Sequence, residues 1–172
     1  MKIVMEYNSE IHHRRSIRLK DYDYSQDGYY FVTICVKHFV RYLGEIKNGE
    51  MGLSMIGKIV REYWNEIPYH FNNVMLDEMV IMPDHFHGIV IIDPVRACHG
   101  MPLLQQFAKP KPKSLSMIVN HFKSAVKRWC NKNNFEYFQW QRNYYEHIIR
   151  DEKELYRIRQ YIKNNPLEHL NK

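Results

Sequence analysis

Two histidines stand two residues apart near the middle of the chain, where a pair of imidazoles could hold a metal ion. The stretch MPDHFHGIVII (82–92) carries His85 and His87 on either side of a phenylalanine, directly after a Pro83-Asp84 turn. On a β-strand, side chains at i and i+2 point to one face, so these two imidazoles project together. Adjacent imidazoles suit one divalent cation. The spacing also fits two ordinary half-buried histidines at a strand end, and it leaves both interpretations open.

A metal site built on this pair needs a further ligand from another part of the chain. The acids close by in sequence are Asp77, Glu78 and Asp84. The late segment QYIKNNP (160–166) offers another candidate, because Tyr161 and Asn165 are four apart and share one face of a helix. Asn165 could then give an amide oxygen to the metal while Tyr161 presents its hydroxyl. The same spacing is also consistent with a packed tyrosine and an asparagine that caps the helix.

The elements that must position these residues predict an α+β fold. Four segments rich in β-branched and aromatic residues are predicted strands: 28–36, 74–82, 85–92 and part of 140–150. Two segments with apolar residues at helical spacing are predicted helices: 54–67 and 114–132. A last helix is predicted to start at Asp151, with Glu154 at capping-box spacing, and to stop at Pro166. This order predicts a ferredoxin-like antiparallel sheet with two crossover helices and a C-terminal helix.

Length and composition predict one domain over 1–172, since 172 residues of which 45% are apolar can bury a sizeable core. Residues 1–27 are polar and basic and are predicted to form an N-terminal arm. Residues 93–113 alternate Lys and Pro at their end, which predicts a flexible basic loop. No apolar run approaches the roughly 20 residues of a membrane span. Three scattered cysteines, with no C-x-x-C spacing, predict reduced thiols and a cytoplasmic location.

The net charge of +6 permits a nucleic-acid partner, and its distribution favours one. No acid interrupts the bases between Lys109 and Lys132, and a second basic stretch lies near the start of the chain. Four aromatic residues accompany them: Tyr22, Tyr24, Phe122 and Trp129. Two solvated surfaces are the simpler alternative to contacts with phosphates and bases. The candidate DNA-binding residues are Arg14, Arg15, Arg18, Lys20, Lys109, Lys111, Lys113, Lys123, Lys127 and Arg128.

Five stretches can be read together in chain order: RRSIRLKDYDYSQDGYYFVTI, LSMIGKIVREYWNEIP, VIMPDHFHGIVII, FKSAVKRW and WQRNYYEHIIRDEKELYRIRQYIKNNP. In this order they resemble the single-tyrosine transposases of the HUH superfamily, and best the small REP-associated tyrosine transposases and related bacterial insertion-sequence enzymes. The resemblance runs from about Arg14 to Pro166. The combination of P-x-H-x-H with a late Y-I-x-x-N-P is specific, whereas either motif alone is not.

The resemblance implies a role for each residue of the candidate site. His85 and His87 match the paired histidine ligands of a divalent metal, Mg²⁺ or Mn²⁺, and Asn165 matches the helix residue that completes that site. Tyr161 matches the nucleophile. Asp84 stands where relatives often carry asparagine, and it adds a negative charge beside the metal. The implied activity is cleavage and rejoining of hairpin-flanked single-stranded DNA through a 5′-phosphotyrosine intermediate.

Other functions stay open on the sequence. They are a non-catalytic, domesticated nucleic-acid-binding protein of the same fold, a replication initiator or relaxase of the HUH superfamily, and a metal hydrolase that activates water. A homodimer also stays open, because the relatives include dimers in which the partner's tyrosine helix completes each site. The sequence names no clear proton acceptor for Tyr161, and its candidate neighbours are His147, Arg150 and Lys163.

Overall fold

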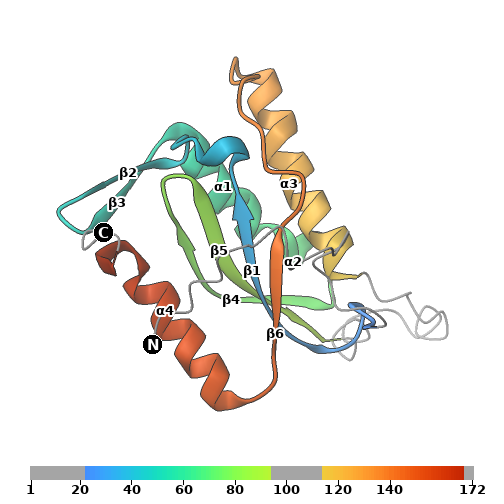
Figure 1. Cartoon of the computed structure of the whole chain (residues 1–172). Coiled ribbons are helices and arrows are strands. Elements are labelled where there is room, and N and C mark those ends of the chain that lie inside the picture. The colour runs from blue at the N-terminus through green and yellow to red at the C-terminus, as the bar shows by residue number, and fades with distance from the viewer. Residues whose placement is uncertain (1–21, 94–113, 169–172) are drawn as a thin grey trace, which may run out of the picture.

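Helices and strands alternate around one antiparallel sheet in the computed structural model, which describes residues 22–93 and 114–168 (Figure 1). The elements in chain order are β1 (Gly28–Cys35), the 3₁₀ turn η1 (Lys37–Phe39), β2 (Gly44–Lys47), β3 (Glu50–Leu53), α1 (Met55–Asn65), α2 (Ile67–His70), β4 (Val74–Ile81), β5 (His85–Ile92), α3 (Leu115–Lys132), β6 (Tyr145–Ile149) and α4 (Glu152–Glu168). The four predicted strands and three predicted helices are all present among them.

The main sheet has the strand order β4-β5-β1-β6, and each neighbouring pair is antiparallel. The two central strands, β1 and β5, are not adjacent in sequence, and the two crossovers of the sheet contain α1 and α3. This is the arrangement of a ferredoxin-like α+β fold, so the predicted fold class is confirmed.

Each face of the sheet has its own helical cover (Figure 1). On one face, Tyr30, Val32 and Ile34 of β1 are fully buried in the large core beneath α1 and α3. On the other face, a smaller apolar cluster joins the sheet to α4: Ile89, Ile149, Leu155 and Ile162. A side chain on the second face therefore meets α4, and that is the helix that carries Tyr161.

A short hairpin, β2–β3, is an element that the predicted fold lacks. Its strands pair antiparallel and are joined by Asn48 and Gly49, both with positive φ (52° and 82°). Two central residues with positive φ form the type I′ turn that Asn-Gly favours. The hairpin leads into α1, whose N-cap is Ser54, with the Gly57 N–H donating to Ser54 Oγ at 3.0 Å.

The last helix begins as predicted but ends later. The Glu154 N–H donates to Asp151 Oδ1 at 2.8 Å, and the Glu154 carboxylate accepts from the Arg150 N–H at 2.9 Å. The prediction that Pro166 stops this helix is wrong, because α4 continues to Glu168. Proline removes the N–H that would bond the Ile162 carbonyl, so this helix loses one hydrogen bond near its end, and only two residues follow the proline.

Much of the predicted arm and loop lies outside the described residues, namely 1–21 and 94–113. Of the arm, Tyr24 is buried in the core, and the Tyr22 hydroxyl lies 3.2 Å from that of Tyr30. Tyr24 therefore packs as a core residue, and is not placed for contact with bases. Cys35 and Cys130 are buried free thiols. In the described part of the chain, none of the helices has the length and apolarity needed to cross a membrane.

Candidate active site

The first three residues of β5 place the two histidines on the face of the sheet that α4 covers. The rings of His85 and His87 lie 4.7 Å apart, centroid to centroid. Phe86 points to the opposite face and packs on Trp64 at 4.5 Å in the main core. The prediction that the two imidazoles project together, with the phenylalanine turned away, is thereby confirmed in geometry.

A hydrogen bond fixes the orientation of His85. Its Nδ1 lies 2.6 Å from Asp84 Oδ1, and both side chains are about one-fifth exposed. A carboxylate can only accept, so Nδ1 carries the proton of this bond. A neutral His85 then keeps a lone pair on Nε2. A carboxylate or carbonyl on the second ring nitrogen is the usual support of a metal-binding histidine.

His87 is held more tightly and is only 5% exposed. Phe31 stacks on its ring at 5.3 Å, and Thr33 Oγ1 lies 2.8 Å from its Nδ1. Burial, followed by the nearby charge of His85, lowers the pKa of His87 to about 3. The ring is therefore neutral at physiological pH, which is the form that binds metals.

Tyr161 reaches this histidine from α4 within the same chain. Its hydroxyl lies 3.3 Å from Nε2 of His87, and the two rings are 5.4 Å apart. Phe31 meets both rings, since it also contacts the Tyr161 ring edge-on at 6.1 Å. The tyrosine is 42% exposed, so part of its side chain is accessible to solvent.

Asn165 follows Tyr161 by one helical turn and is 8% exposed. It is thus buried inside α4, and it is not an exposed cap at the end of the helix. Within residues 22–93 and 114–168, no three His, Cys, Asp or Glu side chains gather as a metal site. The candidate metal ligands are therefore the imidazoles of His85 and His87 and the side-chain amide of Asn165. Imidazole nitrogens and amide oxygens both bind divalent cations.

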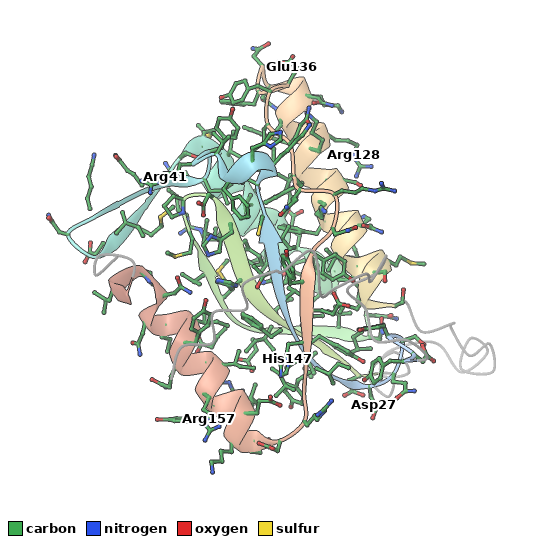
Figure 2. The ribbon with its side chains drawn as sticks, viewed as in Figure 1. Asp27, Arg41, Arg128, Glu136, His147 and Arg157 are labelled. Atoms are coloured by element: carbon green, nitrogen blue, oxygen red, sulfur yellow. The ribbon has the colours of Figure 1, made fainter. Side chains whose placement is uncertain are left out.

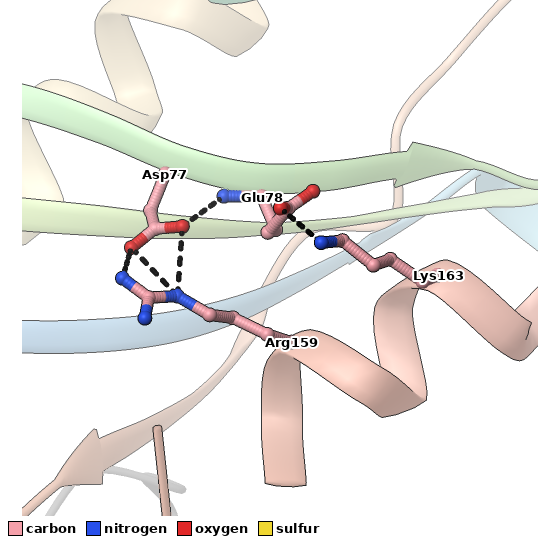
Figure 3. A network of polar contacts seen from close by, with 4 residues as sticks. All are labelled: Asp77, Glu78, Arg159 and Lys163. Atoms are coloured by element: carbon pink, nitrogen blue, oxygen red, sulfur yellow. Dashed lines mark hydrogen bonds and ion pairs between the residues drawn. The ribbon is translucent and has the colours of Figure 1, made fainter. Parts of the chain in front are cut away.

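A bulge in β4 fixes α4 over the site. The register passes from the pair Leu76–Val90 to the pair Met79–Gly88, so two residues, Asp77 and Glu78, stand opposite one. In a regular strand, neighbouring side chains point to opposite faces, but a bulge can redirect them. Here both carboxylates reach α4, as Figure 3 shows.

Asp77 and Glu78 bind two bases that flank Tyr161 on α4. The Arg159 guanidinium donates to both carboxylate oxygens of Asp77, with distances of 2.5 to 3.2 Å, and Lys163 Nζ lies 2.8 Å from Glu78 Oε1. Burial acts to raise the pKa of Asp77, but the Arg159 hydrogen bonds and the Glu78 N–H outweigh it, so the net pKa is lowered. These carboxylates hold the helix in place, and are not directed at the histidines as metal ligands.

Comparison with known proteins places this geometry in a family. No protein-family model matches the chain. An uncharacterized protein of Haemophilus influenzae is 47% identical over 167 residues, which cover 94% of this chain and 93% of that protein. A putative REP-associated tyrosine transposase of the same organism is 28% identical over 158 residues, 86% of this chain and 74% of that one.

A solved structure of a REP-associated tyrosine transposase bound to a REP hairpin has the same fold. It superimposes with a TM-score of 0.60 at 18% identity, over 88% of this chain and 73% of that one. The chain belongs to one family with the 47%-identical Haemophilus protein, and it is similar in sequence and fold to REP-associated tyrosine transposases. This kinship supports a transposase role, and the predicted family is confirmed.

The basic side chains of α3 that were candidates for DNA binding differ in their contacts. Lys123 is buried and its Nζ donates to the carbonyls of Gln141 and Arg142 at 2.7 and 3.1 Å. Lys127 Nζ donates to two further carbonyls, at 2.8 and 2.7 Å. Both ammonium groups thus anchor the segment between α3 and β6. Phe122 is a core residue, whereas Arg128 is exposed on the outer side of α3 (Figure 2).

The remaining candidate DNA-binding residues of this transposase-like chain lie outside the described residues. They are Arg14, Arg15, Arg18, Lys20, Lys109, Lys111 and Lys113. Of the candidate proton acceptors, His147 Nε2 lies 2.7 Å from Glu154 Oε1, and Lys163 pairs with Glu78. The Arg150 backbone binds Glu154 as well. Acidic side chains therefore hold the side chains of His147 and Lys163.

Two features of the site were not predicted. Thr33 binds His87 from β1, and the Asp77–Arg159 contact spans 82 positions in the sequence. Thr33 gave no signal, because the register of β1 on β5 sets its place. Arg159 and Lys163 did carry a signal, since two bases four apart on the helix face beside Tyr161 favour acidic partners.

Proposed function

We propose that this protein is a metal-dependent DNA transposase that cleaves and rejoins hairpin-flanked single-stranded DNA through a 5′-phosphotyrosine intermediate. The observation that carries the proposal is the contact of the Tyr161 hydroxyl with Nε2 of His87, at 3.3 Å across the α4–β5 interface. Nucleophile and histidine pair meet within one chain. The relative bound to a REP hairpin supports hairpin DNA as the partner.

The cleavage step follows from the chemistry of a phenol. The Tyr161 hydroxyl gives up its proton to solvent, and its oxygen attacks the scissile phosphorus and forms a Tyr–O–P bond to the new 5′ end of the strand. The bond from phosphorus to the 3′ oxygen breaks, and that oxygen leaves as a free 3′-hydroxyl once it takes a proton. Attack of another 3′-hydroxyl on the same phosphorus releases Tyr161 and rejoins the strand. The number of phosphodiester bonds is conserved, so no ATP is needed.

Three residues of the chain would hold the divalent cation, Mg²⁺ or Mn²⁺. His85 and His87 would bind it through Nε2, since each uses Nδ1 for Asp84 or Thr33. Asn165 would add its amide oxygen. A cation bound there would polarise the scissile phosphate. Neighbouring residues position the reacting groups. Phe31 packs against the His87 and Tyr161 rings, and the Asp77–Arg159 pair holds α4 in place.

The proposed DNA surface comprises the exposed base of α3 and the two basic stretches. Arg128 lines a pocket of about 350 Å³ on the face opposite Tyr161, together with Tyr63, Trp129 and Lys132. Cations beside partly exposed aromatic rings suit a phosphate and a stacked base. Arg14, Arg15, Arg18, Lys20, Lys109, Lys111 and Lys113 complete the proposed surface. Lys123 and Lys127 are excluded from it, because carbonyl oxygens occupy their ammonium groups.

A denaturing gel tests the proposal. The protein is incubated with labelled hairpin-containing single-stranded DNA and Mn²⁺, and a covalent protein–DNA adduct is expected. The adduct should disappear in Tyr161→Phe and in His85→Ala. Tyr156→Phe is the matched control, because Tyr156 is on the same helix and is 63% exposed, away from the histidines.

Other outcomes, in this assay or with other DNA substrates, would change the assigned nucleophile or the function. An adduct that persists in Tyr161→Phe would move the nucleophile to another tyrosine. DNA binding without any adduct would favour a non-catalytic binding protein, and cleavage that survives Tyr161→Phe without an adduct would favour a water-using hydrolase. Cleavage at a replication origin or transfer site would favour an initiator or relaxase.

A further inference from the structure

Thr33 is the only threonine in the chain, and the sheet places it directly opposite His87. The two residues are register partners on β1 and β5, and both point to the α4 face. The Thr33 hydroxyl oxygen lies 2.8 Å from Nδ1 of His87, while Nε2 of the same ring faces the Tyr161 hydroxyl at 3.3 Å. Thr33 and Tyr161 therefore contact the two nitrogens of one buried imidazole from opposite sides.

A neutral imidazole carries one N–H, so these two contacts have opposite polarity. In one tautomer the Nδ1–H donates to Thr33 Oγ1, and the lone pair on Nε2 accepts from the Tyr161 hydroxyl. In the other, Thr33 donates to Nδ1, and the Nε2–H donates to the Tyr161 oxygen. Only the first tautomer leaves on Nε2 the lone pair that a metal ligand needs.

The surroundings of the ring favour the first tautomer. Thr33 is partly exposed, so its own hydroxyl proton can go to water while its oxygen accepts from the imidazole. His85, on the same face, has its Nδ1 on an acceptor-only carboxylate, that of Asp84. Both histidines of the pair then present Nε2 as a lone pair. Phe31 stacks on His87 at 5.3 Å and restricts rotation of the ring, so the proton position is the main freedom left.

We propose that Thr33 is a positioning residue, whose hydroxyl holds His87 as the Nδ1–H tautomer and so keeps the Nε2 lone pair directed at Tyr161 and the metal position. The proposal rests on the proposed function for its meaning in catalysis. Its structural content, the tautomer of one ring, does not depend on DNA or on a metal.

Two variants separate the hydroxyl from the shape of the residue. Thr33→Val keeps a β-branched side chain suited to a central strand but removes the oxygen, and Thr33→Ser keeps the oxygen but removes the methyl group. In the valine variant a buried Nδ1–H would lose its acceptor, at a cost that favours moving the proton to Nε2. There the Tyr161 oxygen can accept it. The serine variant should retain the wild-type tautomer.

The test is nitrogen NMR on metal-free protein labelled at histidine, in which protonated and unprotonated ring nitrogens resonate separately. His87→Gln assigns the His87 signals by their loss. We expect an Nδ1–H ring in the wild type and in Thr33→Ser, and an Nε2–H ring in Thr33→Val. A wild-type ring protonated at Nε2, or a tautomer unchanged in the valine variant, would overturn the proposal. If the valine variant fails to fold, Thr33→Ala removes the same oxygen and should show the same Nε2–H ring.

Adduct formation with hairpin DNA is the second readout. Loss of a group that supports a metal-binding histidine costs about 10- to 100-fold in activity, so Thr33→Val should slow adduct formation by that factor, with rescue in Thr33→Ser. A shifted tautomer with unchanged adduct formation would overturn the catalytic part of the proposal. If the wild type forms no adduct, the proposed function fails, and the NMR result stands apart from it.

Discussion

The hydroxyl of Tyr161 lies 3.3 Å from Nε2 of His87, although 74 positions of sequence separate the two residues. The two residues meet because α4 packs on the face of the sheet that carries the histidines (Figure 1). No second copy of the chain is needed to bring them together. The contact thus bears directly on whether one chain can assemble its own active site.

Mixing two inactive variants tests assembly within one chain. His87→Ala retains the tyrosine, and Tyr161→Phe retains the histidine pair, so a site shared between partners would regain one intact copy in a mixed dimer. Because the contact is made within a single chain, we expect no more adduct from the mixture than from either variant alone. Recovery of adduct in the mixture would show that α4 acts on the partner's histidines.

The ion pair between Asp77 and Arg159 should hold α4 in place. Asp77→Asn removes the charge that accepts from the guanidinium, and we expect the free energy of unfolding to fall by about 1 to 2 kcal/mol. Glu45→Gln is the control, because Glu45 and Lys47 form a pair in which both side chains are mostly exposed. Its effect should stay within about 0.5 kcal/mol. Equal effects of the two variants in urea unfolding would contradict this role of Asp77.

Acid should loosen α4 in the wild type. The pKa of Asp77 is lower in the folded chain than its ordinary value. Its carboxylate therefore contributes its full stabilisation of the folded state above the unfolded carboxyl pKa of about 4. That contribution is lost as the pH falls through the lower, folded pKa. Hydrogen exchange of the α4 amides, corrected for intrinsic rates, should therefore increase below about pH 4. Asp77→Asn should show a weaker dependence, and an equally steep one would rule out this carboxyl as its source.

Some of this site could be predicted from sequence because it rests on local periodicity. The alternation of a strand placed His85 and His87 together, and the helical period placed Tyr161 and Asn165 on one side of α4. The hairpin β2–β3 also carried its signal, the dipeptide Asn48-Gly49, which the prediction missed. These features need only a few neighbouring residues to specify them.

The features that could not be predicted depend on tertiary contacts. Thr33 meets His87 only through the register of two strands that are not adjacent in sequence. Lys123 appeared as a surface base because its partners are backbone carbonyls, which no side-chain pattern reveals. The bulge that turns both Asp77 and Glu78 towards α4 likewise leaves no periodic pattern in the sequence. In each case a hydrogen-bond partner distant in sequence decides what the residue does.

Lys123 and Arg128 should separate stability from DNA binding. Lys123→Met removes a buried ammonium group that donates to two backbone carbonyls, so the free energy of unfolding should fall by roughly 1 to 3 kcal/mol. Arg128→Ala should change stability by no more than about 0.5 kcal/mol but reduce the salt dependence of DNA affinity by about one phosphate contact. Binding titrations at several salt concentrations measure this slope. A reduced slope in folded Lys123→Met would return that lysine to the DNA surface.

Gly88 should be intolerant of a side chain, because its backbone lies against the Trp64 ring of α1. A Cβ at this position would lie 2.5 Å from Trp64 Cζ2 and 2.8 Å from Phe86 Cζ, and neither buried ring has room to withdraw. We expect Gly88→Ala to lower the free energy of unfolding by about 1 to 3 kcal/mol. Because His87 precedes Gly88, displacement of the strand away from Trp64 should also weaken the contact between His87 and Tyr161 and slow adduct formation.

Gly52→Ala is the matched control for this strand position. Its Cβ would meet only the Glu45 carbonyl oxygen, at 3.5 Å, which is ordinary contact. Both variants add one methyl group to a strand and differ in the space that receives it, so only Gly88→Ala should lower the urea midpoint markedly. If the two variants unfold at the same midpoint, the close approach of Trp64 to β5 does not constrain the strand that carries the histidines.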